Sequence, residues 1–368
     1  MSFQPASGAI DLNPQQVELN KKISKSLSSI FKLWGYEEVS PPRIERLETL
    51  NAGGAINTRD IVKLVANEPL GLRPEMTASI ARMACTRLAK KTRPLRLFAT
   101  GTVFESKEAG DGGISIEENL VTGVELIGAE GINAEIELLS LLLSSIETLK
   151  VSQENKPTLL VGHTSFMKLF LEKFDNTTQS YVKDALVTFN KIEIENLNIN
   201  KRDKDLLLYI NECRGHPKSV LSNLSKEFRN NKLIHRLENM FEIIDTIATE
   251  SGIRIQLDPT FYPHFELYDG LVFNLVCHTE SGPLVISSGG RYDGLLNKIN
   301  KKGNSEFGLG FTFAIDKIRE LKTLNSEELL SKKKILLCFD NISKLNLVLK
   351  KQKELHKLGN IALIDLNP

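Results

Sequence analysis

The spacing of apolar residues predicts a long amphipathic helix near the start of the chain. Ile23, Leu27 and Phe31 recur every four positions and therefore share one face of a helix. Asn13 followed by Pro14 is typical of a helix start, because the asparagine side chain can accept a backbone N–H and proline needs no partner in the first turn. We expect this helix to pack its apolar face on the core.

Alternating apolar and polar residues further along the chain predict a mostly antiparallel sheet assembled from distant segments. The strongest hairpin signal lies in LRLFATGTVFES and NLVTGVELIGAEG, which a polar glycine-containing loop separates. Four more strand patterns follow far downstream, in IRIQLDPTF, DGLVFNLVCHT, PLVISSGG and FGLGFTFA. Between them, about residues 157–250 alternate short helical patterns with polar loops, which is typical of a helical insertion. The sequence therefore predicts an α+β fold with about six strands flanked by helices.

The end of the chain has a pattern of its own. After a main domain of residues 1–322, TLNSEELLSKKK predicts a linker over residues 323–333. The remaining residues 334–368 contain one strand pattern, one helical pattern and the start of a second strand. We expect them to form a short, truncated α/β segment, which is too small to be a complete domain.

Composition and charge exclude several classes of function. The 47 basic and 46 acidic residues nearly cancel, so the chain has no general attraction for nucleic acid or anionic membranes. No apolar run reaches membrane-spanning length, and the N-terminus lacks the pattern of a secretion signal, so we expect a cytoplasmic protein. No metal site is predicted, because the four cysteines are far apart in the sequence and we expect them to be reduced thiols: Cys85, Cys213, Cys277 and Cys338.

Five short motifs, in order, resemble the catalytic domain of class II aminoacyl-tRNA synthetases, above all histidyl-tRNA synthetase. GYEEVSPP resembles the first class II motif, TGTVFESKEAG…GVELIG the second and GLGFTFAIDKI the third. GLRPEMT and GGRYDGL resemble stretches specific to the histidyl branch. Each motif alone is a weak signal, but five in the right order over about residues 10–320 make a strong one. The resemblance implies a class II synthetase-like fold that forms a dimer through its first motif.

The positions that such enzymes use for adenylate formation are altered. Joining a carboxylate to ATP needs fixed cations, and the resemblance places these cations at Glu105, Pro263 and Lys317. Glu105 would repel a phosphate, Pro263 has no side-chain donor, and Lys317 lacks the bidentate fork of arginine. Two alternatives stay open. Lys107 would supply the missing cation if the alignment is shifted, and His264 would be the donor if Pro263 only stiffens a turn.

Part of the amino-acid pocket is retained. The resemblance assigns Glu75, Thr77 and Glu125 to recognition of the amino group of histidine and makes Tyr268 a wall. Val121 stands where the family has a glutamine, which puts recognition of free histidine in doubt. A pocket role and an inherited polar core, stabilised by internal hydrogen bonds, are equally open.

Arg291 and Tyr292, in GGRYDGL, have two interpretations that the sequence does not separate. Both side chains belong to the pocket in one. In the other, the glycines allow a tight turn and the arginine pairs with a carboxylate of the fold.

The altered adenylation positions and the short C-terminal segment together resemble the regulatory subunits of ATP phosphoribosyltransferase. The resemblance implies a subunit with no catalysis of its own and no cofactor, which assembles with the short-form catalytic subunit and controls the first step of histidine biosynthesis. It implies a homodimer within a hetero-oligomer, with a hetero-octamer as the expected form, that responds to free histidine and binds no tRNA. Two alternatives remain: an active adenylate-forming synthetase relative, and a synthetase-derived RNA-binding or scaffold protein.

Overall fold

The structure is a computed structural model of the 368-residue chain, and it divides into two compact units, Met1–Leu321 and Lys322–Pro368. Each unit is described by itself. The described residues are 3–54, 59–108, 112–262, 267–300, 306–321, 334–338, 341 and 344–365.

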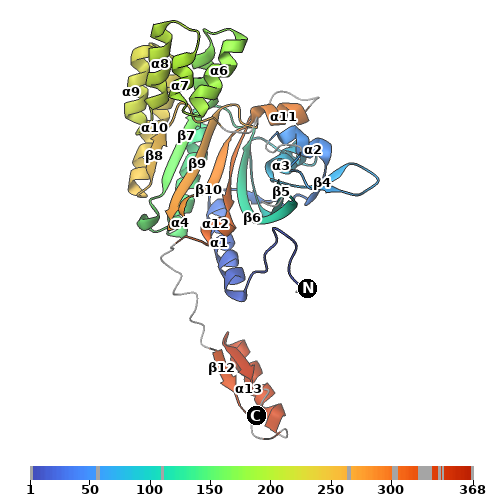
Figure 1. Ribbon diagram of the computed structural model, residues 1–368. Coiled ribbons are helices and arrows are strands. Elements are labelled where there is room, and N and C mark those ends of the chain that lie inside the picture. Colours follow the sequence, from blue (N-terminus) through green and yellow to red (C-terminus); the bar gives the residue numbers. More distant parts are fainter. Residues whose placement is uncertain are drawn as a thin grey trace. The chain divides into compact units, whose positions relative to one another are not determined.

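A large, mostly antiparallel sheet forms the centre of the first unit (Figure 1). The resemblance to the class II synthetase fold predicted this architecture. The sheet has eight strands rather than about six, because the short strands β1 and β8 extend its two ends in parallel pairs. In spatial order the strands are β1 (Glu37–Glu38), β5 (Leu95–Glu108), β6 (Ile114–Ile127), β11 (Gly308–Ala314), β10 (Gly282–Arg291), β9 (Leu271–Thr279), β7 (Thr158–His163) and β8 (Arg254–Leu257).

Helices cover both faces of this sheet, and the alternation of side chains along β5 and β6 decides which face each residue joins. Phe98 and Val124 pack into the core beneath α1 and α4, whereas Leu97 and Val121 join a second core with α3 and α11. Glu125 follows Val124 on β6 and therefore lies on the α3 side. The helices of the first face are α1 (Pro14–Leu33), α4 (Ile132–Leu149) and α12 (Ile315–Ile318); those of the second are α2 (Leu47–Gly53), α3 (Thr77–Cys85) and α11 (Asp293–Ile299).

The first helix begins where its sequence predicts. The Asn13 side chain accepts the Gln16 backbone N–H, and the Gln16 side chain accepts the Asn13 backbone N–H, which together make a capping box in front of Pro14. The apolar face of α1 is buried through Ile23, Leu27 and Phe31. Such a cap is worth roughly 1 kcal/mol.

A bundle of helices continues from β7 at one end of the sheet (Figure 1). The sequence pattern placed the start of this insertion near residue 157, but Thr158–His163 form β7 of the large sheet, and the helices begin at Thr164. The run is too short for its apolar pattern to distinguish a buried strand from a helix. The helices are α5 (Thr164–Leu171), α6 (Asn176–Val187), α7 (Lys191–Asn196), α8 (Lys201–Glu212), α9 (Pro217–Glu227) and α10 (Lys232–Glu250).

A small second sheet lies beside α2, and the second unit has a sheet of its own. The small sheet orders β2 (Ile44–Arg46), β4 (Leu70–Leu72) and β3 (Lys63–Leu64) in antiparallel pairs. In the second unit, α13 (Leu345–Lys357) connects two parallel strands, β12 (Lys334–Leu337) and β13 (Ile361–Ile364).

Candidate functional site

Five of the six predicted pocket residues gather around one buried carboxyl group. Glu125, 2% exposed, accepts the Thr77 hydroxyl at 2.7 Å on Oε1 and the Tyr292 hydroxyl at 2.5 Å on Oε2. Glu75 and Tyr268 lie within electrostatic reach of the same carboxyl group. We call Glu75, Thr77, Glu125, Tyr268 and Tyr292 the Glu125 cluster.

Burial dominates the electrostatics of this cluster. Burial raises the pKa of Glu125 to about 8, and the neighbouring Glu75 adds to the rise, although the hydrogen bonds from Tyr292 and Thr77 oppose it. Burial also raises the pKa of Glu75 above its usual value. Glu125 therefore holds a proton at neutral pH, whereas hydrogen bonds and the charge of Arg73 oppose the rise at Glu75. A bound ammonium group would favour the ionised forms of both carboxyl groups.

Glycines on the neighbouring strands make room for the cluster. Gly310 lies opposite Glu125 in the pairing of β6 and β11, and a Cβ there would come within 2.0 Å of Glu125 Oε2. A Cβ at Gly290 of β10 would likewise lie 2.7 Å from the Cδ1 atom of Tyr268. Any larger residue at either position would displace the side chain beside it.

Glu75 also has a structural role. Its two carboxylate oxygens accept the Ala78 backbone N–H at 3.0 and 3.1 Å, so the side chain caps the first turn of α3. This cap fixes the carboxyl group at the helix start, beside Thr77.

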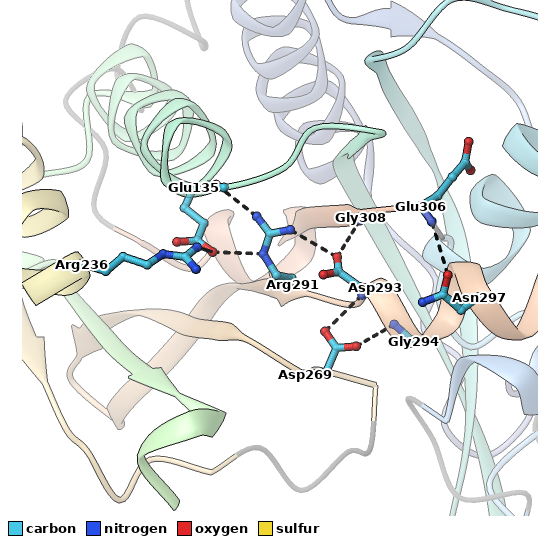
Figure 2. A network of polar contacts seen from close by, with 10 residues as sticks. Glu135, Arg236, Asp269, Arg291, Asp293, Gly294, Asn297, Glu306 and Gly308 are labelled. Atoms are coloured by element: carbon cyan, nitrogen blue, oxygen red, sulfur yellow. Dashed lines mark hydrogen bonds and ion pairs between the residues drawn. The ribbon is translucent and has the colours of Figure 1, made fainter. Parts of the chain in front are cut away.

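Arg291, the sixth predicted pocket residue, belongs to a separate polar network (Figure 2). Its Nε donates to Glu135 Oε1 at 3.0 Å, and Arg236 Nη2 from α10 donates to the same oxygen at 2.7 Å. Its Nη1 donates to Asp293 Oδ1 at 3.2 Å, and its Nη2 to the Gly131 carbonyl at 3.3 Å. Adjacent residues at the end of β10 thus divide the two roles left open by the sequence: Arg291 connects the fold, whereas Tyr292 belongs to the cluster.

Asp293 and Asp269 extend this network to the start of α11 (Figure 2). Asp293 Oδ1 accepts the Gly308 N–H at 2.9 Å, and Asp269 accepts the backbone N–H groups of Asp293 and Gly294 at 3.1 and 2.6 Å. The network therefore holds the turn of GGRYDGL in place.

Glu105 lies on β5 in an ion-pair cluster at the surface. It is directly opposite Glu117 of β6, and Lys107 is paired with both carboxylates, at 3.4 Å from Glu105 Oε2 and 2.6 Å from Glu117 Oε2. Lys107 is the residue that the sequence offered as a substitute cation for a phosphate. In the structure its charge is shared between two carboxylates, which leaves the site with a net negative charge.

Of the other two altered positions, the structure describes Lys317 but not Pro263. Lys317 is exposed on α12, and its side chain forms no ion pair among the described residues. Pro263, with the alternative donor His264, lies outside the described residues.

Arg73 is a connecting residue that sequence reasoning missed. It is 3% exposed, its Nη1 donates to the Pro41 carbonyl at 2.8 Å, and its Nε donates to the Thr102 carbonyl at 3.0 Å. Gly101 leaves space for it, since a Cβ there would lie 2.4 Å from Arg73 Nη2. This arginine therefore joins the first motif to the second.

Two site types have no support in the part of the chain that the structure describes. No group of three or more histidine, cysteine or acidic side chains there is arranged to hold a metal ion. No described helix has the length and apolar content that crossing a membrane requires.

Comparison with known proteins gives consistent results. The family model of histidyl-tRNA synthetase matches residues 8–318. A protein of Prochlorococcus marinus strain MIT 9303 called ATP phosphoribosyltransferase regulatory subunit is 52% identical over 366 residues, covering 100% of this chain and 93% of its own length. A protein of the same name from Synechococcus sp. strain CC9902 is 49% identical over 368 residues, covering 100% of this chain and 94% of its own.

Two solved structures share the fold. The crystal structure of an ATP phosphoribosyltransferase regulatory subunit/histidyl-tRNA synthetase from Bacillus halodurans C superposes with a TM-score of 0.84 at 22% identity, covering 99% of this chain and 93% of that one. Histidyl-tRNA synthetase from Nostoc sp. PCC 7120 gives 0.77 at 17% identity, covering 100% of this chain and 87% of that one.

Proposed function

Because the chain belongs to the histidyl-tRNA synthetase family and, within it, to the ATP phosphoribosyltransferase regulatory subunits, we propose that it activates a catalytic subunit and performs no chemistry itself. One observation carries the second half of this proposal. At the position where the synthetases hold a phosphate with arginine, this chain places Glu105 opposite Glu117, and Lys107 is the cation paired with both among the described residues. A triphosphate arriving there would meet net repulsion.

The partner we propose is the short-form catalytic subunit of ATP phosphoribosyltransferase. The sequence predicts that the chain forms a homodimer inside a hetero-oligomer, expected to be a hetero-octamer, in the cytoplasm. It also predicts no tRNA binding, in keeping with its balanced charge. Regulation through assembly uses the retained shape of the fold and needs no adenylation chemistry.

We propose further that the Glu125 cluster binds free histidine as the feedback signal. Its two carboxyl groups suit an ammonium group, and the hydroxyls of Thr77 and Tyr292 hold one of them in place by donating to Glu125. Histidine then lowers the rate of the assembly if it binds the inactive state more tightly than the active one.

Mixing the chain with a short-form catalytic subunit tests the first proposal. We expect gel filtration to show a larger complex, and the rate of joining ATP to phosphoribosyl pyrophosphate to rise. The chain alone, given histidine and ATP, should show no pyrophosphate exchange. Separate elution with an unchanged rate would refute the regulatory role, and robust exchange would restore the adenylate-forming enzyme.

The Glu125→Gln variant tests the histidine proposal within the same assembly. Loss of one charge-assisted contact should raise the histidine concentration for half-inhibition by about 10-fold or more, while assembly is unchanged. Glu118→Gln, at an exposed position of the same strand, is the matched control and should behave as wild type. Equal inhibition of both variants would place the histidine site elsewhere.

A further inference from the structure

A cavity of about 540 Å³ lies at the base of the helical insertion, and none of its lining residues belongs to the Glu125 cluster. Its walls come from α5, from α6, from the start of α10 and from Tyr262. Its volume is within the range of small-molecule sites, about 300–1,000 Å³.

The charges on its walls favour an anion. Lys168 and Lys183 both line the cavity, and neither forms an ion pair among the described residues. Lys183 Nζ lies 4.2 Å from the centre of the Tyr262 ring, which holds the ammonium group at the wall. Among the described residues of the lining, Glu172 is the one carboxylate, so the two lysines leave these residues with a net positive charge.

The cavity also carries a buried hydroxyl group without a partner. Thr164 is 4% exposed and lines the cavity, and its Oγ1 has no hydrogen-bond partner in the described part of the chain. An unpaired buried hydroxyl costs roughly 1–3 kcal/mol, a cost that a bound acceptor would remove. Ser165 adds a second hydroxyl group. Asn231 adds an amide whose oxygen already accepts the Leu233 N–H at 2.9 Å, so its NH₂ group remains as a donor.

His163, directly before α5, lies close to positively charged side chains beside this cavity. Burial, and after it the charges of Arg236, Arg291 and Lys168, lower the pKa of His163 to about 3. The neutral ring accepts the Ser165 N–H on Nδ1 at 3.1 Å. Arg236 and Arg291 share the carboxylate of Glu135, so Lys168 is the one of these three cations that adds unpaired positive charge at the cavity.

We propose that this cavity binds a small phosphate-bearing metabolite, as an effector site separate from the Glu125 cluster. Phosphate suits it better than carboxylate, because two ammonium groups, two hydroxyls and one amide offer more donors than two carboxylate oxygens accept. The site goes beyond the proposed function, since it concerns a ligand other than histidine and needs no catalytic subunit.

Titration calorimetry of the full chain with pyrophosphate, in buffers of matched ionic strength, tests this site. We expect saturable binding of one pyrophosphate per chain. Lys183→Met should weaken it by about 10-fold or more, because a hydrogen bond to a charged group is lost. Lys226→Met, which removes an exposed lysine of α9 outside the cavity, is the matched control and should bind as wild type. Acetate at the same ionic strength should bind far more weakly.

A second variant and a second measurement protect the test against misfolding. Thr164→Val keeps the shape of the side chain and removes the unpaired hydroxyl, so it should fold normally and bind pyrophosphate more weakly. Hydrogen exchange should show protection of residues 164–187 on binding, and none of residues 217–227. The site would be overturned if the wild type showed no saturable binding, or if Lys183→Met bound pyrophosphate equally well. The phosphate assignment would be overturned if acetate bound as tightly as pyrophosphate. Because no catalytic subunit is present, neither result bears on the regulatory role.

Discussion

Two clusters of ion pairs in this molecule have opposite charge arrangements and differ in their exposure to water. On the hairpin, the cation Lys107 is shared by two carboxylates, Glu105 and Glu117. In the first turn of α4, the carboxylate of Glu135 is shared by two arginines, Arg291 and Arg236. The Lys107 side chain is 47% exposed, whereas Glu135 is 0% exposed.

The difference in burial decides what each cluster does. Water screens the hairpin charges, so exposed pairs of this kind contribute only about 0–1 kcal/mol to stability. A side chain there can therefore be replaced by one of opposite charge without harm to the fold. A buried charge that loses its partners costs far more, so Glu135 is tied to both arginines. Substitutions in the surface cluster around Lys107 can therefore abolish phosphate binding while the fold is kept. The buried cluster around Glu135 instead joins α4, α10 and β10.

The largest expected effect comes from breaking the buried cluster at its centre. Glu135→Gln leaves Arg291, 7% exposed, facing a neutral side chain, and should lower the free energy of unfolding by about 3–5 kcal/mol. Urea denaturation can be followed by fluorescence of Trp34, the one tryptophan of the chain, which lies in the first unit.

The control for this change lies on the same helix. Glu137 pairs with Arg96, and both side chains are partly exposed, so Glu137→Gln should cost only about 1 kcal/mol. Equal losses for the two variants would contradict the role given to burial.

An intermediate effect is expected at Glu125, which is buried like Glu135 but has hydroxyl partners in place of cations. Its pKa is about 8 in the folded chain against an ordinary 4.5, so the folded state retains a proton that the unfolded state releases. Stability from this group is complete below about pH 4.5 and is lost as the pH rises through 8. Glu125→Gln should remove this dependence, and the stability gap between pH 5 and pH 8.5 should shrink by on the order of 3 kcal/mol.

Urea midpoints at the two pH values measure this effect. Glu118→Gln serves as the matched control, since an exposed carboxylate of the same strand should leave the pH dependence unchanged. A Glu125→Gln variant with the pH dependence of the wild type would mean that Glu125 is ionised in the fold.

The sequence predicted those parts of the fold that depend on local periodicity. The α1 cap and the β5–β6 hairpin follow from residues close in the chain, so the sequence predicted both. The proximity of Glu75 and Glu125, which lie far apart in sequence, was predicted through the family resemblance, whereas the sequence left the place of Tyr292 open.

The Glu135 cluster was not predicted, because its partners come from distant elements. Arg236 is 101 positions and Arg291 is 156 positions away along the chain, and only the tertiary fold brings them to one carboxylate. One signal was available: Glu135 lies in the first turn of a helix that is apolar on nearly every side, where an acidic residue needs a cation when buried. The same distance effect concealed Arg73, whose acceptors are backbone carbonyls that no sequence pattern marks.

The smallest expected effect is at the centre of the hairpin cluster. Lys107→Met leaves Glu105 and Glu117 directly opposite each other on paired strands, where like charges repel. Because both carboxylates are 38% exposed, water should hold the loss of stability below about 1 kcal/mol, and 1 M salt should reduce it further by shortening the screening length to about 3 Å. Urea denaturation at low and high salt measures both quantities, and Lys107→Met combined with Glu105→Gln, which relieves the repulsion, should return the stability to near wild type. A loss as large as that of Glu135→Gln, or one that salt does not change, would show that the hairpin charges are shielded from water and that the contrast between the two clusters is not one of burial.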